Sequence, residues 1–168
     1  LDFSALNHEA SSRISGLFKA SGHVSGDLQE LTTSLAIQGA DVSVPGLNPS
    51  TLHTRFQGQI QPGKPQVLGD LQIKAQNSGQ QIVLQTGIDF AHQLLRLPDL
   101  TVQAPKTDLN AFVAYQSQEQ KIDSNIELEI DDLTWLQTFT PHALNGGLSL
   151  DADIKGLVSS PQISAAGL

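Results

Sequence analysis

The side chains that most often do chemistry in proteins are present in this chain, but their spacing fits no reactive site. The five histidines are His8, His23, His53, His92 and His142. No two of them stand at the spacing of metal ligands, and no second type of ligand gathers near any of them. We therefore expect the histidines on solvated faces or in loops, and we predict no metal site.

Four acidic residues toward the C-terminal end could suggest calcium, which prefers carboxylate oxygens. They are Asp131, Asp132, Asp151 and Asp153. The glycine-interrupted loop of a dedicated calcium site is missing around them. We expect Asp131 or Asp132 to cap a short helix, and Asp151 and Asp153 to lie on the wet face of a strand.

Motifs for nucleophilic catalysis and phosphate binding are also missing from the sequence. No serine sits in a Gly-x-Ser-x-Gly elbow, and Asn145-Gly146-Gly147 predicts a turn rather than a phosphate-cradling loop. The chain has no cysteine, which excludes disulfides and thiolate metal sites. We predict that the protein is not an enzyme and uses no cofactor.

The charge balance also narrows the choice of partners. Nine basic and seventeen acidic residues give a net charge of −8, which argues against a nucleic-acid partner. No apolar run approaches the roughly 18 residues of a membrane span. Because the chain starts at Leu1 and contains no methionine, we expect a mature product or, in preference, a segment of a longer protein, with room for an anchor or targeting signal outside it.

Strict alternation of apolar and polar residues is the clearest structural signal. It is strongest over 82–90, 122–130 and 148–155, and it predicts strands with one apolar and one polar face. Further strands are predicted over 18–24, 35–44, 52–60, 71–75, 100–104 and 109–115, with 71–90 forming a hairpin. The apolar positions change from odd to even numbers at Gly39, where we expect a β-bulge.

The period changes after residue 130. Leu133, Leu136 and Phe139 recur every three residues around Trp135, and Pro141 closes the segment, which predicts a short amphipathic helix. We expect the fold to be mainly all-β, with one short helix.

Two arrangements would account for the apolar strand faces. In a sandwich, a second sheet covers them and they form a core. In a single long curled sheet, antiparallel or mixed, they line an open trough with a hydrophobic interior, and they would bind something equally apolar.

Weak internal similarity suggests repeats. Phe56-Gln57-Gly58 followed by Pro65 resembles Ile154-Lys155-Gly156 followed by Pro161. We expect residues 1–168 to form one β-groove unit, with repeats at roughly 17–60, 61–105 and 106–168.

The C-terminal part resembles a unit that recurs in the TamB family. Its elements are Asp132-Leu133-Thr134-Trp135-Leu136, then Gly146 to Gly156 as a glycine-started strand, then a strand entered at Pro161. Segments 21–39 and 42–58 look like β-repeats of the same family. TamB is the inner-membrane-anchored subunit of the translocation and assembly module, and it is similar to AsmA-like and bridge-like lipid-transfer proteins.

The resemblance implies a periplasmic segment that conducts phospholipids between the inner and outer membranes along a β-trough. Through the whole protein, it implies partnership with an outer-membrane barrel of the TamA type. The alternative that we keep is a chaperone-like scaffold for the assembly of outer-membrane β-barrel proteins or autotransporters. A structural solenoid with a sealed apolar core is a third reading. We also expect an unpaired edge strand to allow self-association.

If the trough conducts lipid, its lining comes from the apolar strand positions and holds acyl chains without catalytic groups. The predicted lining residues are Leu84, Ile88, Leu100, Val102, Ile126, Leu128, Ile130, Leu148, Leu150 and Ile154.

Overall fold

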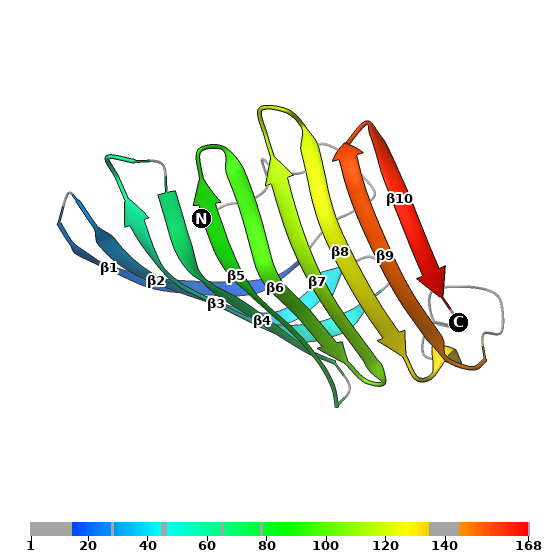
Figure 1. The fold of residues 1–168 in the computed structure, drawn as a ribbon. Helices are drawn as coiled ribbons and strands as arrows, with labels where there is room; N and C mark the ends of the chain where they lie inside the picture. The colour runs from blue at the N-terminus through cyan, green and yellow to red at the C-terminus, as the bar shows by residue number, and fades with distance from the viewer. Residues whose placement is uncertain are drawn as a thin grey trace.

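The computed structural model describes residues 15–27, 29–44, 47–64, 66–77, 79–134 and 145–167. Ten strands in this part of the chain form one sheet, and their order in space is their order in the sequence. Figure 1 shows the strands side by side in a sheet that curls, with β1 and β10 at its two ends. The predicted all-β fold with a single curled sheet is confirmed.

Every pair of neighbouring strands is antiparallel. The strands are β1 (Ser15–Gly26), β2 (Leu31–Val44), β3 (Leu47–Gln61), β4 (Gln66–Asn77), β5 (Gln80–Ala91), β6 (Leu94–Ala104), β7 (Thr107–Gln116), β8 (Lys121–Ile130), β9 (Leu148–Leu157) and β10 (Ser160–Gly167). A sheet built only from sequence neighbours needs no crossover connection, and all its connections are short except residues 131–147, which join β8 to β9.

The predicted hairpin over 71–90 is formed by β4 and β5, in register from Gln66–Ala91 to Asn77–Gln80. The predicted bulge is also present, because the register of β2 against β3 shifts between Gly39 and Val42. The extra residue places Val42 on the same face as Gly39, which explains why the apolar positions change parity there.

Several strands begin earlier than predicted: those expected over 35–44 and 71–75 start at Leu31 and Gln66, and a third case involves a proline. The strand expected over 100–104 begins earlier, at Leu94, so Pro98 lies inside β6. The register of β6 shifts at this point against both β5 and β7, so Pro98 occupies a bulge, where proline is tolerated in a strand.

Side-chain groups satisfy the backbone of β5 beside this bulge. The Gly87 N–H donates to Asp99 Oδ1 at 2.8 Å, and the Gly87 carbonyl accepts from the Thr86 hydroxyl at 2.9 Å. These bonds replace ladder partners at the irregularity, so the sheet continues across it.

The two faces of the sheet differ in exposure. Along 51–60 of β3, exposed residues alternate with half-buried ones, and the half-buried ones include Leu52, Phe56 and Ile60. A flat, uncovered sheet would expose both faces equally. We therefore place the apolar face on the inside of the curl, where side chains converge.

Two facing glycines let the apolar face bend near Phe56. Gly58 of β3 pairs with Gly69 of β4. A Cβ on Gly58 would lie 2.7 Å from the Phe56 ring, and one on Gly69 would lie 2.8 Å from it. The ring thus covers the backbone of both glycines, an arrangement that supports curvature in sheets.

The predicted helix falls mostly outside the described residues, including Trp135, Leu136 and Phe139. The described start is a 3₁₀ turn at Leu133 and Thr134. Asp132, one of the two predicted caps, caps this turn, because its Oδ1 accepts from the Thr134 N–H at 2.9 Å.

Candidate functional site

The candidate site is the apolar face of the sheet, defined by the strand positions that share a face with Leu84. Cross-strand partners in a sheet point to the same side, so the register identifies its members. One row of directly paired residues crosses every strand. It consists of Ala20, Ile37, Thr54, Ile73, Leu84, Val102, Leu109, Leu128, Leu150 and Gly167.

This row sets the length of the apolar face. Neighbouring strands lie about 4.8 Å apart, so nine steps from β1 to β10 span roughly 43 Å along the sheet. The face is therefore a strip that runs across the strands rather than along them.

All ten predicted lining residues lie on the apolar face. Four of them, Leu84, Val102, Leu128 and Leu150, belong to the central row. Ile130 is paired directly with Leu148, and Leu100 and Ile126 are joined through Ala111.

The remaining two lining residues stand apart from this group. Ile88 lies opposite Gly69 of β4, and Ile154 lies between Ser124 of β8 and Ile163 of β10, so neither is paired directly with another of the ten. Ile130 is buried, with 5% of its surface exposed, and the other nine lining residues are half-buried.

The sequence-based list of lining residues was incomplete, both before Leu84 and between its members. Further apolar residues of β2 to β7 lie on the same face and are half-buried, among them Ile37, Phe56, Leu71, Ile73, Leu95, Leu97, Leu109 and Val113. The alternation that identified the strands would also have identified these residues, except Leu95 and Leu97, which precede the bulge in β6.

The apolar face carries no charged side chain on the described strands. Charged residues lie on the opposite, polar face or in turns. On that face acidic residues even stand opposite one another, as Asp108 does with Glu129 and Glu127 with Asp151. The segregation of charge leaves the apolar face to contacts that need no polar partner.

Nothing in the described part of the chain seals the apolar face into a core. All described strands belong to one sheet, so the two-sheet sandwich is not formed. Only Val42, Ile130 and Ala152 are buried hydrophobic residues, and no large side chain is fully buried among the described residues. A sealed core of this size would bury many.

Two buried threonines on the apolar face differ in whether the side-chain hydroxyl has a hydrogen-bond partner. Thr86 is 5% exposed and donates to the Gly87 carbonyl. Thr107 is 8% exposed, and its Oγ1 has no hydrogen-bond partner. Such an unsatisfied group costs free energy.

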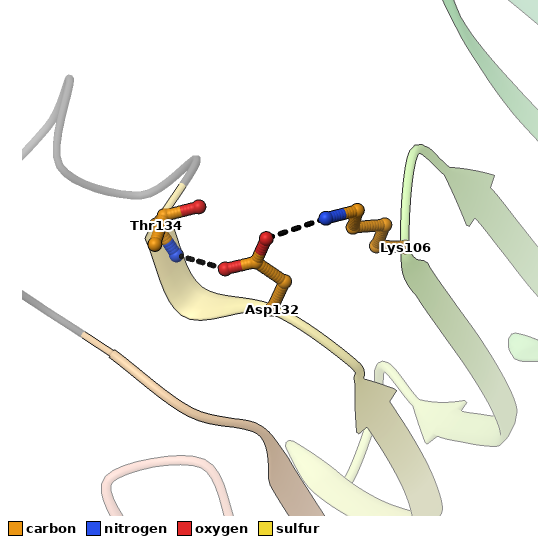
Figure 2. Close-up of polar contacts among 3 residues, drawn as sticks. All are labelled: Lys106, Asp132 and Thr134. Carbon is orange, nitrogen blue, oxygen red and sulfur yellow. Dashed lines mark hydrogen bonds and ion pairs between the residues drawn. The ribbon is translucent and has the colours of Figure 1, made fainter.

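A polar cluster holds one end of the sheet, where β6 turns into β7 and β8 ends. Figure 2 shows Asp132 between Lys106 and Thr134. The Lys106 Nζ donates to Asp132 Oδ2 at 2.5 Å, and the Asp131 N–H donates to the Lys106 carbonyl at 2.9 Å. The bond from the Lys106 ammonium, with those from Thr134, holds the pKa of the Asp132 carboxyl well below its ordinary value.

The other candidate residues take the positions expected of solvated groups. His23, His53 and His92 are exposed, whereas His8 and His142 lie outside the described residues. Asp151 and Asp153 are on the polar face and exposed, as predicted. Within the described ranges, no group of three or more acidic, histidine or cysteine side chains is placed to hold a metal ion.

Comparisons with protein families, curated proteins and solved structures found no match to this chain. None of the helical structure in the described residues is long and apolar enough to cross a membrane.

Proposed function

We propose that the chain is a lipid-carrying segment whose apolar face holds acyl chains. The observation that carries the proposal is the uncharged, half-exposed strip that crosses all ten strands. Monomeric proteins rarely expose a continuous apolar surface of this extent unless it binds something.

The chemistry of the strip favours hydrocarbon over a polar ligand. Burying each CH₂ of an acyl chain is worth roughly 0.8 kcal/mol, so a tail laid along the strip is held without directional bonds. Because such contacts do not depend on position, a tail can shift along the strip without a chemical step. The headgroup stays in water at the open side.

The resemblance to the TamB family supplies the setting of the proposal. In that setting the ligand is a phospholipid, the location is the periplasm, and transfer runs between the inner and outer membranes. A TamA-type outer-membrane barrel is the partner of the whole protein. Within this proposal the chain acts as a conduit and performs no reaction.

Leu84→Glu tests the proposal, with Gln85→Glu as its matched control. The two positions are adjacent on β5, and both variants add one carboxylate, but Leu84 faces the strip and Gln85 is exposed on the other side. Native mass spectrometry after detergent-free purification measures copurified phospholipid. Circular dichroism establishes that each variant is folded.

The proposal expects phospholipid on the wild type and on Gln85→Glu, and its loss from a folded Leu84→Glu. Equal lipid on both variants would contradict it. Absence of lipid from the wild type, even after incubation with phosphatidylethanolamine vesicles, would also overturn it.

A further inference from the structure

Asn145 is the one asparagine in the sequence that is followed by glycine. The other asparagines precede His8, Pro49, Ser78, Ala111 and Ile126. The backbone nitrogen that follows an asparagine can attack its side-chain amide, and glycine hinders this attack least because it has no Cβ. The Asn145-Gly146 pair lies in the connection between β8 and β9, outside the apolar strip, and has no part in the proposed function.

The structure leaves both reacting groups accessible. Asn145 and Gly146 are exposed. Across the part of the chain that the structure describes, neither the Asn145 side chain nor the Gly146 N–H takes part in a hydrogen bond. A Cβ placed on Gly146 would meet nothing within 4 Å, so open space surrounds its backbone. No described group therefore keeps the Gly146 nitrogen away from the Asn145 amide.

The backbone at Gly146 is held on one side only. Its φ of +96° is a conformation that residues with a Cβ rarely adopt. The Gly146 carbonyl accepts from the Leu133 N–H at 2.8 Å. This bond fixes the carbonyl of Gly146 and leaves its N–H, which is the attacking group, unengaged.

The sheet protects the asparagines that lie within its strands. Asn110 is exposed like Asn145, but it belongs to β7, and the following Ala111 pairs with Leu100 of β6 and Ile126 of β8. For the Ala111 nitrogen to reach the Asn110 amide, the backbone would have to leave the ladder on both sides, which requires local unfolding. Asn110 is therefore the internal control for Asn145.

We propose that Asn145 is a site of spontaneous deamidation through a succinimide formed with Gly146. The Gly146 nitrogen loses its proton and bonds to Cγ of Asn145, the Cγ–Nδ2 bond breaks, and ammonia leaves with that proton. Water then opens the ring. Breaking the new N–Cγ bond gives aspartate, and breaking the original backbone C–N bond gives isoaspartate. The net change consumes one water and releases one ammonia.

Either product alters the connection between β8 and β9. A carboxylate replaces a neutral amide in a connection that already contains Asp131 and Asp132. Isoaspartate also adds a carbon to the main chain directly before Gly146. Because Gly146 accepts the Leu133 N–H, this insertion should displace that bond and speed hydrogen exchange at the Leu133 amide.

Peptide mapping of the folded protein tests the proposal. The protein is incubated at mildly alkaline pH in water labelled with heavy oxygen, in parallel with a sample unfolded in urea, and the digests are analysed by mass spectrometry. Asn145 should convert to labelled aspartate and isoaspartate in the folded protein, at a rate within a few-fold of that in urea. Asn110 should convert far more slowly in the folded protein than in urea. Gly146→Ala places a Cβ beside the attacking nitrogen and should slow conversion at Asn145, with circular dichroism to establish that the variant is folded.

Three results would overturn the proposal. Conversion of Asn145 in urea but not in the folded protein would show that the fold keeps the two groups apart. Equal conversion at Asn145 and Asn110 in the folded protein would show that the open connection gives no advantage. Aspartate without isoaspartate, or an unchanged rate in folded Gly146→Ala, would show that the reaction does not pass through the succinimide.

Discussion

Replacing Thr107 by valine is expected to stabilise the protein. Thr107 starts β7 on the apolar face, between Ala104 and Ile130, and is only 8% exposed. Its hydroxyl has lost water and has no hydrogen-bond partner. Valine has nearly the same shape and a similar preference for strands, so the substitution removes the unsatisfied group and adds little else.

The size of the effect follows from the cost of burying a hydroxyl without a partner. Mutational data place that cost at about 1–3 kcal/mol, and we expect the gain from Thr107→Val to lie near the lower end because part of the residue is exposed. For a chain of this length each kcal/mol corresponds to roughly 2–4 °C in the midpoint of thermal unfolding.

Thr86→Val is the matched control, because it makes the same change in a residue of similar burial that does have a partner. The Thr86 hydroxyl donates to the Gly87 carbonyl at 2.9 Å, so its removal should cost about 1 kcal/mol. Urea denaturation of both variants, followed by circular dichroism, measures the two changes. Opposite signs support the reasoning, whereas equal destabilisation by both variants would refute it.

Three further substitutions test other parts of the sheet. Asp99→Ala removes the acceptor of the Gly87 N–H and should lower the free energy of unfolding by about 0.5–1.5 kcal/mol, with Asp99→Asn closer to wild type in urea melts. Gly58→Ala should lower the thermal midpoint sharply, because its Cβ would lie 2.5 Å from a backbone oxygen, whereas Gly63→Ala, which meets nothing within 4 Å, should leave the midpoint unchanged. The pKa of Asp132 is lower in the folded protein than in the unfolded chain, so its ionised form stabilises the fold above the ordinary carboxyl pKa, and this stabilisation is lost as the pH falls below it. When the free energy of unfolding is measured against pH, Asp132→Asn should therefore lose less stability in acid than the wild type. An equal loss in both proteins would contradict this account.

The strands with clean alternation could be predicted from sequence, whereas the start of β6 could not. Residues 94–97 were not predicted as strand because their apolar side chains do not alternate and Pro98 follows at once. The turn before them, at residues 92 and 93, also contains no residue type that would predict a turn from the sequence. His92 and Gln93 both adopt positive φ, at 50° and 63°, which glycine and asparagine normally mark.

The bulge at Pro98 explains why alternation did not predict the first residues of β6. An extra residue in β6 reverses the parity of its side chains, so Leu95 and Leu97 share a face with Leu100 and Val102 although their numbers differ in parity. The alternation within β6 alone cannot show this reversal, because the face of each residue is revealed only by its pairing with β5 and β7. The bulge at Gly39 was predictable because an unbroken alternation flanks it on both sides.

Outside the bulge of β6, membership of the apolar face could be predicted from the sequence, but its exposure could not. Period-two alternation states which side chains share a face, and it is identical for a sandwich core and for an open strip. What lies opposite the face depends on how far the sheet curls and whether it closes. Gly58, Gly69 and the bulges of β2 and β6 act on those properties through backbone geometry. The curl leaves the strip half-exposed, so the lipid proposal rests on this bent backbone and not on the alternation alone.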